Sequence, residues 1–222
     1  MEWQAFRLSL ELAAWTTVIL LPLALVIARF LAWHSFRGQS LVQALVALPL
    51  LLPPTVLGFY LLTAFASDGW LGRFYETLVG QPLAFTFEGL LLASILFNVP
   101  FAVQPMQRGF EAVSRDVREA AWCSGMSRWS TFLRIELPLA WPGLLSAFVL
   151  TFAHTLGEFG VVLMVGGSIP GETRTIAIAI YDRMQAFDES AAASMAAVLL
   201  GFSLAAIALV HVLGGRVGAR RG

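Results

Sequence analysis

Five polar side chains stand inside stretches that are otherwise apolar. His154 and Glu158 are four residues apart, a spacing that puts both on one face of a helix. Asn98, Thr151 and Thr155 lie in similar surroundings. Polar groups in such stretches mark either a path for a polar solute or a set of internal hydrogen bonds. A lone histidine is more often hydrogen-bonded within the protein, and threonine hydroxyls often bond back to their own helix.

Several enzyme chemistries lack the residues that they need in this sequence. A zinc protease helix needs a His-Glu-x-x-His motif, and His34, His154 and His211 form no such pattern. Ser168 has no evident histidine partner. Because there is no lysine, neither a P-loop nor a Schiff base can form. A single cysteine, Cys123, excludes an internal disulfide and a cysteine-based zinc cluster. We therefore expect no enzyme activity, no metal and no cofactor.

The elements that position these residues are membrane helices. Of the 222 residues, 58% are hydrophobic and 13% are charged, whereas a soluble domain carries about 25% charged residues. A bilayer core demands about 20 apolar residues per helix. We predict an all-α integral membrane protein with one domain, residues 1–222, and about five spans. The spans cover approximately Leu10–Trp33, Leu41–Phe65, Gly89–Gln107, Leu139–Val165 and Ala191–Leu213.

The distribution of arginine predicts the orientation. All fourteen basic residues are arginine. One set of loops carries Arg37, the cluster from Arg108 to Arg134 and the C-terminal arginines, and the opposite set carries fewer. Cytoplasmic loops of membrane proteins are the more basic ones. We therefore expect the N-terminus outside and the C-terminus inside, with residues 108–138 in the cytoplasm.

Proline interrupts two of the predicted spans. Leu48–Gly58 reads "LPLLLPPTVLG" and Asn98–Pro105 reads "NVPFAVQP". Proline removes a backbone hydrogen bond and bends a helix, and the freed carbonyls within lipid need other partners. These sites are either packing kinks or the lining of a substrate path.

The segment Arg118–Gly143, "REAAWCSGMSRWSTFLRIELPLAWPG", combines charged and apolar residues, whereas the sequence around it is mostly apolar. Ser114–Ser124 is predicted to form a short helix that Gly125 ends. The residues that follow show partial helical periodicity and predict a second short helix, after which Pro138 and Pro142 restart the chain into the membrane.

These two short helices form a compact cytoplasmic knob. We expect Arg118 and Glu119 on its outer surface and Ala120 and Ala121 on a close-packing face. Such a knob can dock into another protein. The alternative is an amphipathic helix that lies on the membrane surface.

The knob resembles the "EAA" motif of ABC importer permeases. The matching residues are Glu119-Ala120-Ala121, Gly125, Ile135 and Leu137-Pro138, at the family's spacing. The resemblance implies the type I importer permease fold, and it assigns residues 108–138 to coupling with a cytoplasmic ATPase subunit. The missing P-loop is then explained, because a separate chain hydrolyses ATP.

A second stretch narrows the resemblance. The pieces "LGEFG" and "SIPGETRTI", between His154 and Tyr181, are similar to molybdate permeases. Similarity runs from Trp3 to about Val212. Sulfate permeases share the "GEFG" piece. The resemblance implies import of molybdate or tungstate, with sulfate or thiosulfate import as the alternative.

The resemblance also implies partners and a location. The protein is expected to be a multi-pass component of a bacterial inner membrane. Its partners would be cytoplasmic ABC ATPase subunits, a periplasmic molybdate-binding protein and a second copy of itself, because five spans make half a path. Membrane lipid surrounds it, and no nucleic acid is expected.

Glu158 is the strongest candidate for a gate in this path. At 1.5 Å per residue it lies roughly 28 Å from the cytoplasmic start of its span at Leu139, near the outer surface. A carboxylate repels a dianion, so we expect gating rather than substrate binding. The alternative is a paired interfacial residue, with Arg174 as partner. Gly157 and Gly160 flank Glu158 and allow either close helix approach or a local bend. The other path candidates are Asn98, Thr151, His154 and Thr155.

The segment "SIPGETRT" is predicted to lie outside the membrane. Pro170-Gly171 is typical of a turn, and Glu172 and Arg174 are then exposed or paired. The family resemblance favours contact with the binding protein or the outer gate. The alternative is a plain solvated loop.

Overall fold

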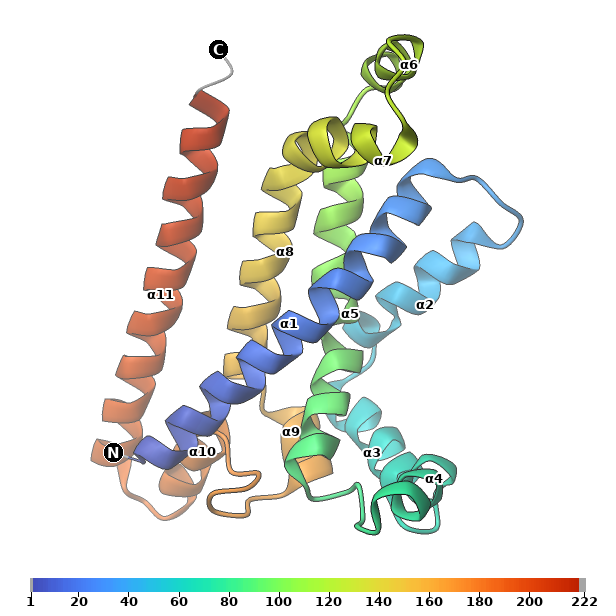
Figure 1. The fold of residues 1–222 in the computed structure, drawn as a ribbon. Coiled ribbons are helices and arrows are strands. Elements are labelled where there is room, and N and C mark those ends of the chain that lie inside the picture. Colours follow the sequence, from blue (N-terminus) through green and yellow to red (C-terminus); the bar gives the residue numbers. More distant parts are fainter. Residues whose placement is uncertain (1, 220–222) are drawn as a thin grey trace.

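The computed structural model describes residues 2–219, except for the side chains of residues 206 and 209–219. Every regular element within this range is a helix, which confirms the predicted all-α class (Figure 1). The elements are α1 (Trp3–Trp33), α2 (Gln39–Leu51), α3 (Pro54–Phe65), α4 (Trp70–Val79), α5 (Phe87–Glu111), α6 (Arg115–Cys123), α7 (Arg128–Thr131), the π-helix η1 (Phe132–Glu136), α8 (Leu137–Gly157), α9 (Gly160–Gly166), α10 (Ile176–Gln185) and α11 (Glu189–Ala219).

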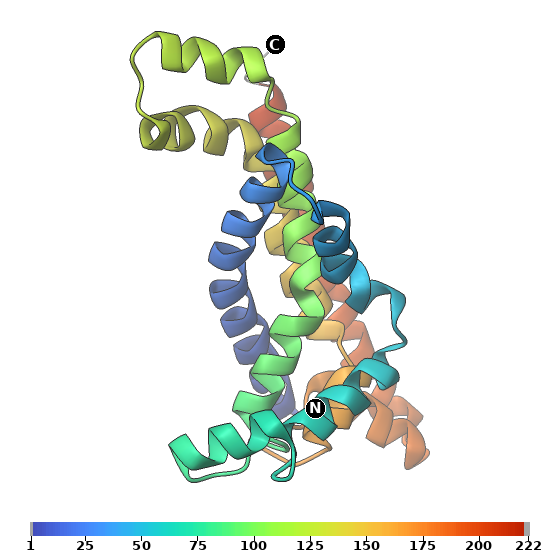
Figure 2. The same ribbon diagram turned by 90° about the vertical axis from the view of Figure 1, so that its right-hand side faces the viewer.

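Three long helices, α1, α5 and α8, pack against one another and form the centre of the molecule (Figures 1 and 2). The main hydrophobic core lies between them. It combines Leu20, Ala24, Ala28 and Leu31 of α1 with Ala102, Val103, Met106 and Phe110 of α5 and Ala140 and Ala147 of α8. The many alanines bring the helix backbones close together, as is usual in membrane bundles. The helix α11 packs beside α8.

The closest approach of α5 and α8 is made by two glycines. A methyl group added at Gly143 would lie 2.5 Å from the carbonyl oxygen of Pro105 and 2.9 Å from the Cα of Gly109. Only residues without a Cβ fit this crossing. The helices that carry the candidate polar residues are therefore held backbone to backbone.

Three segments among the described residues are long and apolar enough to cross a membrane: α1, α5 and the continuous run Arg128–Gly157. The run Phe87–Glu111 is longer than the span predicted there, and it stays helical through Pro100 and Pro105. The helix α11 coincides with the fifth predicted span, but it is only partly described. The count of five spans and their orientation remain predictions.

The second predicted span, Leu41–Phe65, is interrupted at the prolines that the sequence marked as helix breakers. It breaks into α2 and α3, whose axes differ by 107°. The break falls at "PP": Pro53 precedes α3 and Pro54 opens it. Two consecutive prolines lack the N–H groups that would continue the α2 ladder, and each disfavours helix in the residue before it.

The fourth predicted span, Leu139–Val165, is also interrupted. The helix α8 ends at Gly157, Glu158 is extended, and the chain restarts as α9 at Gly160. Apolar composition continues through this break, which is why hydropathy alone did not reveal it. The break places Glu158 at a helix end rather than within a helix.

The short helices gather at the two ends of the long ones (Figure 1). The helices α6 and α7 lie at one end, together with the far end of α11. The helices α3, α4, α9 and α10 lie at the other end, near the N-terminus. The bundle therefore presents a helical projection at one end and a broader cap at the other.

Candidate functional site

The knob, defined as residues 112–136, is built by local capping. Ser114 caps α6 by accepting a hydrogen bond from the Val117 N–H at 3.3 Å. At the other end, the N–H groups of Gly125 and Met126 donate to the carbonyls of Trp122 and Ala121. This pair of bonds is a Schellman motif, and Gly125 has the positive φ, 82°, that the motif requires. The prediction that Gly125 ends the first knob helix is confirmed.

Within the knob, Glu119 and Ala120 are exposed whereas Ala121 is buried. The expectation that both alanines share a packing face is therefore wrong: adjacent positions on a helix point about 100° apart. Ile135 and Leu137 are half-buried and Pro138 is exposed. The motif residues thus divide between an exposed surface on α6 and a partly buried base on η1 and α8.

Arg118 does not lie on the outer surface as expected. Its Nε donates to Glu136 Oε1 at 2.9 Å, and its guanidinium lies 3.7 Å from the centre of the Trp33 ring. Its side chain is only 13% exposed. Arg118 instead points back from the knob toward the end of α1.

Glu136 is the functional candidate that sequence reasoning missed. Its carboxylate is completely buried, and it accepts one hydrogen bond from Arg118 of α6 and one from Arg29 Nε of α1 at 2.7 Å. We call these three residues the Glu136 clasp. It links the knob, the end of α1 and the start of α8. The available signal was an acidic residue within the apolar run "RIELP", together with Arg29 at a predicted span end.

Farther along α8, His154 pairs with Asn98 of α5. The distance from His154 Nδ1 to Asn98 Oδ1 is 3.1 Å, and Asn98 Nδ2 donates to the Ser94 carbonyl at 2.8 Å. Because the amide oxygen can only accept, Nδ1 carries the hydrogen. The His154 ring also stacks on Phe101 at 4.0 Å. His154 is thus hydrogen-bonded within the protein, the commoner of the two cases considered.

The two threonines of α8 differ in their hydrogen bonding. Thr155 donates to the carbonyl of Thr151 at 2.8 Å, the back-bonding expected of a helical threonine. The Thr151 hydroxyl is buried and has no hydrogen-bond partner among the described residues. Both threonines and Asn98 are buried, so none of the three faces an open cavity in this conformation.

Glu158 occupies the break between α8 and α9. Its Oε1 accepts the Val161 N–H of α9 at 3.0 Å, and its Oε2 lies 3.9 Å from His154 Nε2. Gly160 is needed at this break, because a Cβ there would lie 2.7 Å from the Pro54 side chain of α3. Nothing lies within 4 Å of a Cβ at Gly157. The two broken segments, α2–α3 and α8–α9, therefore meet beside Glu158.

The alternative considered for Glu158, a pairing with Arg174, is not what the structure shows. Arg174 donates to the Ser168 hydroxyl at 2.9 Å and lies 3.5 Å from Asp182 and 3.9 Å from Glu2. Its partners thus come from its own loop, from α10 and from the N-terminal end of the chain. Glu158 lies elsewhere, at the α9 start.

The loop before α10 contains the predicted turn. Gly171 has a φ of 81°, and Pro170, Gly171 and Glu172 are exposed. Thr173, in contrast, is buried and anchors the loop through its hydroxyl to the Gly166 carbonyl at 2.6 Å. The turn is therefore an exposed tip on a fixed base. Within the described residues, no group of three or more histidine, cysteine or acidic side chains could hold a metal ion.

Comparisons with known proteins agree with this geometry. The family described as "Binding-protein-dependent transport system inner membrane component" matches residues 21–219. A similar structure is the crystal structure of a bacterial ABC transporter involved in the import of the acidic polysaccharide alginate. The TM-score is 0.78 at 17% identity, and the match covers 96% of this chain and 78% of that one.

Curated relatives are closer in sequence. The molybdenum transport system permease protein ModB of Azotobacter vinelandii is 47% identical over 90% of this chain and 88% of its own length. ModB of Escherichia coli K12 is 36% identical over 94% of this chain and 91% of its own length. A probable sulfate transport system permease of Chlorella vulgaris is 31% identical over 93% of this chain and 77% of its own length.

The family match over residues 21–219, together with the shared fold, identifies the class as a permease of an ABC importer. The chain belongs to the family of binding-protein-dependent transport system inner membrane components. It is a multi-pass inner-membrane transport component rather than an enzyme.

Proposed function

We propose that this chain is the membrane permease of a molybdate importer, and that it can also carry tungstate. The observation that carries the proposal is the 47% identity to a molybdenum permease over 90% of the chain. The lower identity to a sulfate permease, 31%, makes sulfate or thiosulfate the second candidate. These oxyanions share a tetrahedral shape and a double negative charge, so the permease has little basis for separating them by itself.

In this proposal the chain works with three partners. ATPase subunits bind the knob through Glu119, Ala120 and the turn at Gly125. A periplasmic binding protein contacts the exposed tip at Pro170, Gly171 and Glu172. A second copy of the chain completes the path. The exposed positions of the first two groups support such contacts.

A cavity of about 550 Å³ between α2, α5 and α8 supports the proposal that each copy of the chain supplies half of the path. Its polar lining comes from Gln104, Arg108 and Ser146. Among the described residues, no carboxylate pairs with the Arg108 side chain, so its charge is available to an oxyanion. Leu50, Pro100, Phe101, Gln104 and Pro105 line this cavity, and they come from the two proline-interrupted stretches for which a path lining was one of the two alternatives. None of the other path candidates expected from the sequence lines it. We assign them instead to the outer gate, where Glu158 joins α8 to α9 and contacts His154.

The proposed mechanism is alternating access. ATP binding closes the two ATPase subunits and moves the knobs. The Glu136 clasp transfers this displacement to α1 and α8, which carry the core and the gate. The path then opens to the binding protein, receives the anion and opens inward after hydrolysis.

Uptake of radioactive molybdate tests the assignment. A bacterial strain that lacks its own molybdate importers would express this chain together with the ATPase and the binding protein that are encoded next to it in the genome. We expect ATP-dependent uptake that excess tungstate suppresses and excess sulfate does not. Equal suppression by sulfate would establish the second candidate. Uptake that persists with a catalytically inactive ATPase would contradict ATP-driven import by this chain.

A further inference from the structure

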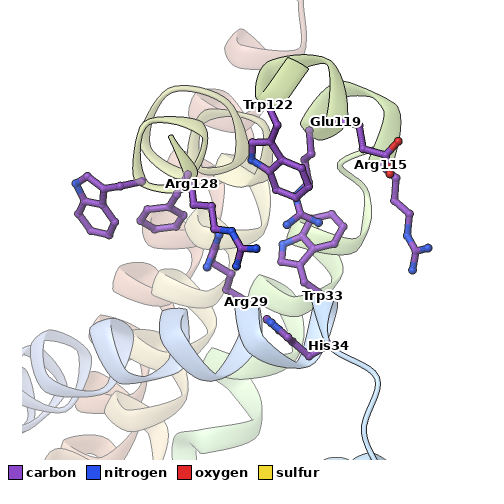
Figure 3. A pocket seen from close by; sticks show the side chains of 10 residues that line it. Arg29, Trp33, His34, Arg115, Glu119, Trp122 and Arg128 are labelled. Atoms are coloured by element: carbon purple, nitrogen blue, oxygen red, sulfur yellow. The ribbon is translucent and has the colours of Figure 1, made fainter. Parts of the chain in front are cut away.

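A cavity of about 590 Å³ lies between the underside of the knob and the end of α1 (Figure 3). Four arginines line it: Arg29 of α1, Arg115 and Arg118 of α6, and Arg128 of α7. Figure 3 shows Trp122 descending from the knob and Trp33 rising from α1 on the same side of the cavity. The molybdate path proposed above does not use this space, because this cavity and the one lined by Arg108 share no lining residue.

The cavity carries more positive charge than its carboxylates balance. Arg29 and Arg118 share the single charge of Glu136. Arg115 and Arg128 have no carboxylate partner among the described residues, and the cavity's own lining adds only Glu119. Clustered guanidinium groups at an open site attract and hold an anion, and they bind phosphate oxygens with good geometry.

An exposed apolar strip leads from this cavity along α1. Trp33 is the last residue of that apolar helix, and tryptophan favours the membrane–water interface. The ring of His34, which lines the cavity, stacks on Phe30 at 4.8 Å. Phe30 is 47% exposed, and Val26, one turn further along, is 69% exposed. The charged cavity and a lipid-facing surface are therefore continuous.

We propose that this cavity binds the phosphate headgroup of an anionic phospholipid, whose acyl chains lie along the strip of Val26 and Phe30. Basic pockets at the ends of membrane helices bind such headgroups. A free oxyanion would use the arginines but not the strip. Of the proposed ATPase contacts, Glu119 lines the cavity but Ala120 and Gly125 do not, so an ATPase bound to all three would lie mainly outside it. The bound lipid would contact both the knob and α1, and would stabilise their arrangement beside the Glu136 clasp.

Native mass spectrometry of the permease–ATPase complex tests the proposal. The complex would be extracted from bilayers that contain phosphatidylglycerol and phosphatidylcholine, and the retained lipid would be counted. The double variant Arg115→Gln/Arg128→Gln removes the two unpaired charges. The control Arg37→Gln/Arg134→Gln removes two exposed arginines of neighbouring segments that do not line the cavity. Arg115→Lys/Arg128→Lys keeps the charge and checks that the fold is intact.

We expect retained phosphatidylglycerol to fall about tenfold in the glutamine variant, because each basic residue near an anionic headgroup contributes several-fold to binding. The control and the lysine variant should keep most of it. Equal loss in the control would overturn the proposal in favour of general surface attraction. Displacement of the lipid by millimolar inorganic phosphate alone would show a small-anion site instead. Loss of the ATPase from the glutamine variant in every lipid would show that an acidic ATPase segment fills the cavity.

Discussion

A completely buried carboxylate is stable only while its hydrogen-bond donors stay in place. At Glu136 the two donors come from α1 and α6, which are far apart in the sequence. Removing one member of such a group leaves an unbalanced charge in a poorly hydrated place. The three segments that carry Arg29, Arg118 and Glu136 must therefore move together. If they separated, the ion pairs would break and a buried charge would be left without a partner. This is the physical reason for assigning the Glu136 clasp a role in transmission.

Glu136→Gln should destabilise the protein and weaken coupling. The amide can accept only one of the two arginine hydrogen bonds well, and it leaves Arg29 and Arg118 without a counter-charge. Loss of a buried ion-pair partner costs about 3 kcal/mol. We expect a lower apparent Tm in detergent and less transport per ATP hydrolysed. Glu111→Gln, at an exposed residue that Gln107 contacts, is the control. Equal Tm values for the two variants would refute the role of the clasp.

Glu158→Gln should change gating without changing anion preference. Glutamine keeps an oxygen for the Val161 N–H but loses the charge that faces His154. Glu158→Leu loses both. We expect altered basal ATPase activity in each variant, larger in the leucine variant, with an unchanged ratio of molybdate to sulfate uptake. A shift in that ratio with normal ATPase activity would place Glu158 in the substrate site instead.

At the scale of elements, the knob depends on the turn at Gly125. Its φ of 82° is unfavourable for residues with a Cβ, by about 1–2 kcal/mol. Nothing lies within 4 Å of a Cβ there, so the cost is one of backbone conformation alone. Asparagine tolerates this conformation far better than valine. Gly125→Val should therefore uncouple ATP hydrolysis from transport in reconstituted vesicles, whereas Gly125→Asn should stay close to the native protein. Equal behaviour of the two variants would count against the turn as a coupling element.

The crossing of α5 and α8 depends on Gly143 in a different way. Here the constraint is space, because a Cβ would lie 2.5 Å from a backbone oxygen. Overpacking of this kind costs about 1–3 kcal/mol. We expect Gly143→Ala to lower the apparent Tm and the yield of folded protein. Gly201→Ala in α11 meets nothing within 4 Å and should be neutral or slightly stabilising. A neutral Gly143→Ala would mean that the two helices separate at little cost.

Local signals predicted the elements that local interactions determine. The knob helix, its Gly125 end and the turn at Gly171 all follow from caps and positive φ values, and all are confirmed. The prolines marked the interruption at Pro53, but nothing in the sequence predicted that α2 and α3 would turn by 107° there. The break at Glu158 was harder to predict, because apolar composition runs through it. The Glu136 clasp and the partners of Arg174 depend on contacts between distant segments. The order of residues along the sequence does not specify which acidic side chain an arginine will pair with in the folded protein.

At the scale of the whole molecule, the proposed path needs a second copy of the chain. The cavity lined by Gln104, Arg108 and Ser146 is open on one side of the bundle. Figure 2 shows α1 on one side of α5 and α2 on the other, so the cavity beside α2 faces away from α1. A second copy related by a two-fold axis would close the cavity and double its positive charge, which suits a dianion.

Cross-linking across this face tests the dimer directly. In a Cys123→Ser background, which removes the one exposed cysteine, Gln104→Cys places a single thiol in the cavity. We expect a short bifunctional maleimide to join two copies in native membranes. Val26→Cys, on the exposed outer face of α1, should give little cross-linked product although its side chain is 69% exposed. The two-fold arrangement requires Gln104 of each copy to face the same enclosed space, so binding protein and ATP should change the yield at Gln104 and leave Val26 unaffected. Efficient cross-linking at Val26 and none at Gln104 would place the dimer interface on α1 and would require a different path through the molecule.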